Sequence, residues 1–313
     1  MNFNLFDAHC DTLQKICDHG GELKKNSYQL DIARIKRRSG GSVQVFAAFI
    51  DKKNDSLPPF SRCMQLISRY KSEFEKNKET MHHCSSVNDI KKALQTGKVA
   101  SLLSIEGGEA LEGNIENLSR FYEFGVRIIT LCWNYRNEIA DGITEPEGLG
   151  LTDFGKLLIK KMNRLGMLID VSHISEKGFW DVIENSRAPI AATHSNVKAL
   201  KDHPRNLSDE QIKAIIKNNG CIGINIYPEF VKIGGCDSTD IVRHIEYIMA
   251  LGGENNIGIG SDFDGIEALP CDIRSVEQLE KIPNELLRLG YSEKMVENIL
   301  YNNFFRLFEA VIK

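Results

Sequence analysis

The stretch VASLLSIEGGEALEGNIENLSRFYEFGVRIITLCW, residues 99–133, contains two apolar runs separated by a helical pattern. The runs at 99–106 and 126–133 are almost continuously apolar, which is typical of parallel strands that are covered on both faces. Between them, residues 114–125 have apolar side chains at helical spacing, and Gly125 is a common kind of helix end. The stretch therefore predicts a strand, a helix and a second strand in one parallel sheet.

The same unit recurs along the whole chain. We predict eight strands, at residues 4–9, 42–50, 99–106, 126–133, 166–173, 188–194, 221–227 and 256–262. Helical patterns follow at 151–166, at 207–220, where Ser208 and Gln211 have capping-box spacing, and at the tail, 291–313. Eight such units predict a (β/α)8 TIM-type barrel with a C-terminal helix, and an open doubly wound sheet is the alternative. With no linker or low-complexity tract, residues 1–313 are expected to form one domain.

Composition narrows the class of protein. The chain of 313 residues has a net charge of −4, which gives no electrostatic reason to expect a nucleic-acid partner. No apolar run approaches the ~18 residues that a membrane span requires, and residues near Met1 do not resemble a signal peptide. The eight cysteines are scattered without a C-x-x-C pair, which suits reduced thiols. These features predict a cytoplasmic protein without a membrane or nucleic-acid partner.

Polar side chains gather where the predicted strands end. They are His9, Asp11, Glu106, Asp170, His173, His194, Asp262 and Asp264. In a barrel of this type, active-site residues lie at the carboxyl ends of the strands. Burying so many polar groups together without a function would carry a large desolvation cost. By contrast, His82-His83-Cys84 lies in a polar stretch after a charged helix, and we do not expect a metal site there.

The types of residue at the strand ends indicate a metal centre. Imidazoles combined with carboxylates suit a borderline divalent cation, above all zinc. Five candidate ligands are too many for one tetrahedral site with an open position, but they suit two ions that share a bridging carboxylate. The five are His9, Asp11, Glu106, His173 and His194. The predicted chemistry is metal-assisted hydrolysis, in which a bridging hydroxide attacks a carbonyl and a carboxylate moves the proton.

Several longer motifs occur together along nearly the whole chain. They are DAHCDT, SIEGGEAL, RIITLCWN, NRLGMLIDVSHIS, APIAATHS, HPRNLSDEQI and GIGSDFDGI. In combination they resemble the renal (membrane) dipeptidase family, zinc dipeptidases within the amidohydrolase-like barrel enzymes. The resemblance implies two zinc ions per chain. His9 and Asp11 would bind one ion, His173 and His194 the other, and Glu106 would bridge them.

The resemblance also implies roles around the metals. Arg205 would bind the terminal carboxylate of a dipeptide, Asp262 would be the acid/base, and Tyr227 would lie near the substrate. The chain departs from the family at Trp133, where the renal-type enzyme has a histidine. The indole N–H cannot act as an acid, and Asn134 is the nearest amide that could donate instead. A homodimer is what the family suggests.

We therefore expect a cytoplasmic zinc dipeptidase acting on small dipeptide substrates. One alternative is a related amidohydrolase acting on a cyclic amide, a lactone or a deaminase substrate, which would not need Arg205 as a carboxylate clamp. Another is a catalytically quiet barrel that has kept its metal ligands, for which Trp133 is the only support.

Overall fold

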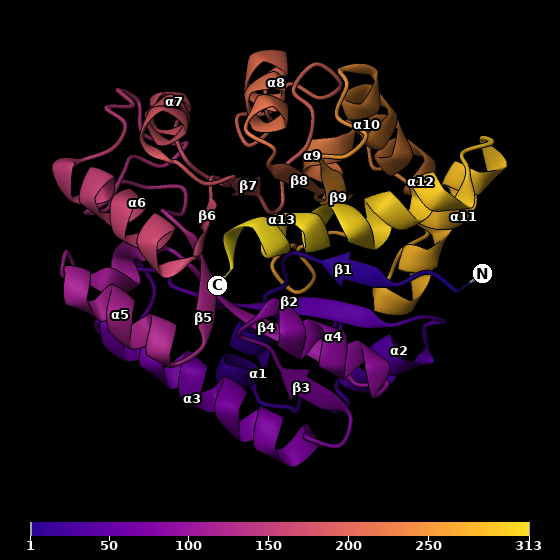
Figure 1. Ribbon diagram of the computed structural model, residues 1–313, viewed down its shortest axis with the longest axis horizontal. Helices are drawn as coiled ribbons and strands as arrows, with labels where there is room; N and C mark the ends of the chain where they lie inside the picture. Colours follow the sequence, from indigo (N-terminus) through magenta and orange to yellow (C-terminus); the bar gives the residue numbers. More distant parts are fainter. Residues whose placement is uncertain (1, 313) are drawn as a thin grey trace.

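Eight parallel strands close into a barrel in the computed structural model, which describes residues 2–312 (Figure 1). The strands are β1 (Leu5–Asp7), β2 (Ser42–Phe49), β4 (Val99–Glu106), β5 (Val126–Thr130), β6 (Leu168–Asp170), β7 (Ala191–Ala192), β8 (Cys221–Ile224) and β9 (Ile257–Ile259). They follow one another in chain order, and the pairing of β1 with β9 closes the ring. Each strand lies within one of the eight predicted segments, so the TIM-type barrel is confirmed.

Helices surround the barrel (Figure 1). They are α1 (Thr12–His19), α2 (Ile32–Arg37), α3 (Pro59–Asn77), α4 (Val87–Gln95), α5 (Ile115–Glu123), α6 (Asp153–Leu165), α7 (Glu176–Asn185), α8 (Asp209–Lys217), α9 (Pro228–Val231), α10 (Ser238–Ala250), α11 (Lys281–Arg288), α12 (Glu293–Glu297) and α13 (Asn303–Val311). The predicted capping box is present, since the Ser208 side chain accepts from the Gln211 N–H and the Gln211 side chain accepts from the Ser208 N–H. The predicted tail helix is interrupted, because a π-helical turn, Asn298–Asn302, separates α12 from α13.

A ninth strand, β3 (Met81–His83), was not predicted. It pairs with the first residues of β4, next to the part of that strand that pairs with β5. The segment lacks the apolar run by which we identified the other strands, because two of its three residues are histidines. The His83 Nδ1 lies 2.9 Å from the Tyr70 hydroxyl, so a protein contact already occupies this nitrogen.

The C-terminal helix α13 packs against the first strand (Figure 1). The ring of Phe6 lies 5.4 Å from the ring of Phe304 and 5.0 Å from that of Phe308, centroid to centroid. These side chains belong to a buried cluster that includes Val43 and Ala100, which lie near the starts of their strands. Apolar packing therefore fills this end of the barrel, and the polar residues project from the opposite, carboxyl end.

Candidate metal centre and active site

Glu106 lies at the centre of the polar cluster at the carboxyl ends of the strands. Its Oε2 lies 3.1 Å from the Nε2 of His9, which follows β1. Its Oε1 lies 3.0 Å from the Nε2 of His173 and 3.6 Å from that of His194, which follow β6 and β7. The two carboxylate oxygens therefore face different histidines, as expected of a bridging carboxylate.

The ligand atoms of the predicted residues lie close enough to one another to bind the same metal ion. Ligand atoms of His9, Glu106 and His194 lie within 4.8 Å of one another, and so do those of His9, Asp11 and Asp262. The His9 Nε2 is 3.3 Å from the Asp11 Oδ2, so the alternating residues of the first strand end do converge as predicted. The structure thus brings all five predicted metal ligands together at one point.

Hydrogen bonds to the far side of two imidazoles fix how their rings are protonated. The His173 Nδ1–H donates to the Asn134 Oδ1 at 2.8 Å. The His194 Nδ1–H donates to the Thr193 Oγ1 at 2.9 Å, because the Thr193 hydroxyl proton is donated to the Asp170 Oδ2 at 2.6 Å. Both Nε2 atoms therefore present lone pairs, which is the arrangement that metal-binding histidines adopt.

The facing atoms are arranged for a cation. The Nε2 atoms of His173 and His194 lie only 2.9 Å apart, and two lone pairs at that distance repel unless a positive charge lies near both. The buried Nε2 of His9 and Oδ1 of Asp11 have no hydrogen-bond partner. Since buried polar atoms are normally paired, these orphaned atoms fit a divalent metal.

The pKa shifts of three predicted ligands, His173, His194 and Glu106, favour the form that binds a metal. Burial lowers the pKa of His173 to about 4, and the positive charge of Arg205 adds to the effect. Burial also lowers the pKa of His194 well below its usual value. Burial would raise the pKa of Glu106, but the neighbouring imidazoles, above all the positive charge of His9, outweigh it and hold the pKa well below the usual range. Neutral imidazoles and an ionised carboxylate are the metal-binding forms. His9 differs, because burial would lower its pKa but the charges of Glu106 and Asp11 raise it well above the usual value.

Strained backbone is concentrated here. Of the five non-glycine residues with positive φ in the described part of the chain, three are His173 (68°), Asp262 (63°) and Asp264 (70°). Such conformations cost free energy and typically occur at functional sites. At Gly265 a Cβ atom would lie 2.2 Å from the Asp11 Oδ2 and 2.6 Å from the Asp262 Oδ1, so a side chain here would collide with both carboxylates.

The sequence profile of the membrane dipeptidase family, peptidase family M19, matches residues 1–313. The chain belongs to this family. Its fold is similar to the crystal structure of the dipeptidase AC, a metallopeptidase of family M19, at 25% identity and a TM-score of 0.92, over 100% of this chain and 99% of the other. It is also similar to a metallopeptidase from Rhodobacter sphaeroides liganded with a phosphinate mimic of L-Ala-D-Ala, at 25% identity and a TM-score of 0.91, over 99% and 100% of the two chains.

A curated relative extends the comparison. An uncharacterized protein of the pqqA 5′ region from Klebsiella pneumoniae is 38% identical over 239 residues, which are 73% of this chain and 88% of that protein. Membership of the M19 dipeptidase family therefore rests on both sequence and structure, and the family is one of metal-dependent dipeptidases. Within residues 2–312, no helix combines the length and apolar character that crossing a membrane requires.

Asp262, the predicted acid/base of this M19 family member, is held by a residue that the sequence analysis did not identify. The Asn225 Nδ2 donates to the Asp262 Oδ2 at 2.7 Å, and the Asn225 Oδ1 accepts from the Tyr227 N–H at 2.7 Å. The Asp262 Oδ1 lies 3.9 Å from the His9 Nε2. Burial raises the pKa of Asp262 well above its usual value, with the carboxylates of Asp11 and Glu106 adding to it. The signal for Asn225 in the sequence is a single amide within the apolar run 221–227.

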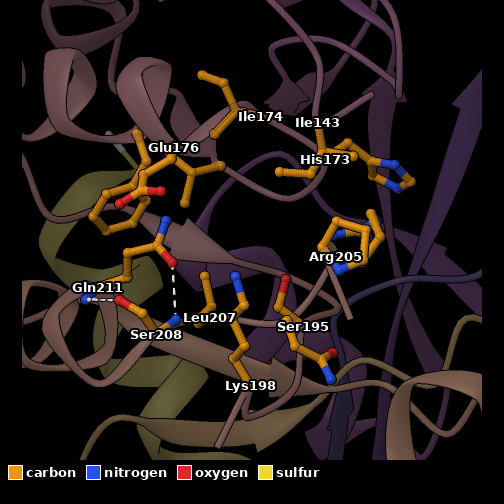
Figure 2. Close-up of a pocket in the computed structure, with 14 residues that line it drawn as sticks. Ile143, His173, Ile174, Glu176, Ser195, Lys198, Arg205, Leu207, Ser208 and Gln211 are labelled. Carbon is orange, nitrogen blue, oxygen red and sulfur yellow. Dashed lines mark hydrogen bonds between the residues drawn. The ribbon is translucent and has the colours of Figure 1, made fainter. Parts of the chain in front are cut away.

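Arg205 is buried, with 7% of its surface exposed. Its Nη2 donates to the His194 carbonyl at 3.3 Å, its Nε has no partner, and no ion pair of this residue is found within residues 2–312. Arg205 lines a pocket of about 110 Å³, and Figure 2 shows it with His173 on one side of this pocket, with Glu176 and Gln211 on the other.

The remaining predicted residues lie around this centre. Trp133 is half-buried, with its ring 6.1 Å from that of His173, centroid to centroid. The Oδ1 of Asn134 is engaged by His173, which leaves its Nδ2 as the available donor. The Tyr227 hydroxyl donates to the Glu267 Oε2 at 2.8 Å. Asp264 orients its loop by accepting from the Thr12 hydroxyl and from the Gln29 N–H.

Proposed function

We propose that this chain is a binuclear zinc dipeptidase that hydrolyses the peptide bond of free dipeptides. The observation that carries the proposal is Glu106, whose two oxygens face His9 on one side and His173 and His194 on the other. His9 and Asp11 would hold one zinc ion and His173 and His194 the second, with Glu106 bridging them. When bound, the ions would activate a water molecule and polarise the substrate carbonyl.

The substrate would be fixed by Arg205. A guanidinium provides a planar pair of donors that matches a carboxylate, and it keeps its charge at any working pH. Arg205 has an unpartnered Nε and lies beside the metal ligand His194, to whose carbonyl it donates. A carboxylate bound there would be that of the second residue of a dipeptide, one residue beyond the scissile bond. The dipeptide mimic bound to the Rhodobacter sphaeroides relative is consistent with this class of substrate.

Asp262 would move the proton. Its Oδ2 is held by Asn225, so its Oδ1, which faces His9, would be the oxygen that takes a proton from the attacking water and delivers it to the leaving amine. A pKa raised by burial favours a carboxyl group that can hold a proton between these two events.

The proposal also covers the domain organisation, the oligomeric state, the location and the partner of the enzyme. We infer one functional domain over residues 1–313 and a homodimer. We also infer a cytoplasmic location, which is supported by the eight cysteines, all within the described residues and none in a disulfide. The partner is the small dipeptide itself, with no nucleic acid or membrane.

The test is a substrate screen on metal-depleted and zinc-restored protein. We expect zinc to restore hydrolysis of dipeptides, and C-terminally amidated dipeptides to be poor substrates because Arg205 would lose its carboxylate partner. Equal rates on a dipeptide and its amide would instead favour a general amidohydrolase on a cyclic amide or another small substrate. Metal binding without any turnover would favour a catalytically quiet barrel, the alternative for which Trp133 is the support.

A further inference from the structure

Three aromatic side chains pack edge to face beside the metal ligands. The ring of Trp133 lies 5.3 Å from that of Phe49 and 5.5 Å from that of Tyr135, with interplanar angles of 67° and 68°. We call Phe49, Trp133 and Tyr135 the aromatic wall. All three side chains are half-buried, so each keeps some surface that a ligand could cover.

Phe49 of the aromatic wall lies across the barrel from Arg205, whereas Trp133 and Tyr135 follow β5, which β6 alone separates from β7. Phe49 is the last residue of β2, and Arg205 follows β7, and three strands separate β2 from β7 in either direction around the ring. Phe49 is also the direct neighbour of Glu106 across the paired strands β2 and β4. Glu106 therefore lies between Phe49 and Arg205, and Trp133 borders the same cluster with its ring 6.1 Å from that of His173, centroid to centroid.

This order along the mouth of the barrel orients a dipeptide. With its carboxylate at Arg205 and its scissile carbonyl at the cluster around Glu106, its first residue extends toward the aromatic wall. We propose that the aromatic wall is the specificity site for that first residue and selects an apolar, preferably aromatic, side chain. This inference rests on the proposed dipeptidase function.

The chemistry of the wall supports this selection. Aromatic rings arranged edge to face offer a rigid apolar surface that accepts another ring in the same geometry. The only polar group of Trp133 is an N–H donor, so a polar or acidic first side chain finds no strong partner from that ring. The Lys53 Nζ lies 3.2 Å from the centroid of the Tyr135 ring, so a cationic first side chain meets a like charge at the edge of the wall.

The first test compares substrates that differ only in the first residue. We expect zinc-restored wild-type protein to hydrolyse Phe-Ala with a kcat/KM roughly 10- to 100-fold above that for Ala-Ala, the range that apolar pockets achieve, with Lys-Ala the poorest of the three. Trp133→Ala and Phe49→Ala should each reduce this ratio by about tenfold or more, mainly through KM. Phe305→Ala removes a half-buried ring from α13, at the opposite end of the barrel, and should keep the ratio. A ratio that Trp133→Ala and Phe49→Ala leave unchanged, or a wild type that favours Ala-Ala or Lys-Ala, would overturn the proposal.

A second readout does not depend on turnover. The chain has two tryptophans, so in a Trp180→Phe protein the emission comes from Trp133 alone. Titration with a non-hydrolysable phosphinate analogue of Phe-Ala should shift or quench this emission at concentrations at least tenfold lower than the Ala-Ala analogue requires. An analogue of Phe-Ala that binds by calorimetry but leaves the emission unchanged would refute the aromatic wall. Failure of every dipeptide to be hydrolysed would refute the proposed function, and the titration decides the wall separately.

Discussion

Replacing Asn225 with leucine should slow turnover while the metal sites remain occupied. Leucine branches at the same carbon as asparagine but offers no donor, so the Asp262 Oδ2 loses the bond of 2.7 Å that holds it. A hydrogen bond to a charged group is worth ~1.5–3 kcal/mol. At ~1.4 kcal/mol for each factor of ten, kcat should fall roughly 10- to 150-fold, because the acid/base is no longer held in place.

The same substitution should also destabilise the fold, and a control must separate the two effects. The Tyr227 N–H would lose its acceptor, at a cost of ~1–3 kcal/mol. The two bonds with Asn196 would remain, because they involve the backbone of Asn225: the Asn196 Nδ2 donates to its carbonyl, and its N–H donates to the Asn196 Oδ1. Asn256→Leu is a matched control, since Asn256 is buried just before β9 and its Nδ2 donates to the Gly220 carbonyl at 2.7 Å, away from the metal centre.

The assay combines steady-state kinetics on one dipeptide, elemental analysis for zinc and urea unfolding. We expect Asn225→Leu to lose kcat with KM nearly constant and with full metal content, and Asn256→Leu to lose stability with kcat retained. A kcat for Asn225→Leu within about threefold of the wild type would refute the reasoning. So would a loss of kcat that follows the loss of zinc, because Asn225 would then support the metal ligands rather than Asp262.

Three further predictions address the metal, the substrate and the fold. Glu106→Ala should lose zinc from both positions, whereas Asp262→Asn should keep zinc and lose turnover; elemental analysis that finds a fully loaded Glu106→Ala protein would contradict the bridging role. Arg205→Lys should lower kcat/KM for dipeptides roughly ten- to a thousandfold, since lysine cannot make the two-pronged contact, and a change below threefold would remove Arg205 as the clamp. Burial, aided by the charge of Arg127, lowers the pKa of His83 to about 4. Between pH 6.5 and 4 the unfolded chain therefore binds a proton that the folded chain does not, and the free energy of unfolding should fall by about 1–3 kcal/mol as the pH drops through this window. His83→Gln should lack this part of the pH dependence in urea titrations, and equal slopes for both proteins would show that His83 is not responsible.

The barrel could be predicted from the sequence because its strands are buried on both faces. The run 99–106 is largely apolar until Glu106, so both the strand and its polar end can be recognised from the sequence. Strand β3 lacks such a run, and its pairing with β4 depends on the tertiary structure.

The site could be predicted by residue type but not by orientation. His173 and Asp262 were visible as polar groups at strand ends, but their left-handed backbone conformations depend on the surrounding loops. Asn225 stood out as one amide in an apolar run, yet its partner, Asp262, follows a different strand. Phe49 reads simply as one apolar residue near the end of a predicted strand, and its contact with Trp133 appears only when β2 and β5 are in place.

The closure of the barrel by its first and last segments has a consequence for synthesis on the ribosome. His9 and Asp11 emerge early, but β1 pairs with β9 through Asp7 and Ile259 and packs on Phe304 of α13. Asp262, the proposed acid/base, follows β9 and is also made late. The nascent chain therefore carries its first two proposed metal ligands for most of translation without the neighbours that hold them in position. Stable binding of the proposed metal ions must await the release of nearly the whole chain, so ribosome-bound intermediates that end before β9 should bind the metal weakly.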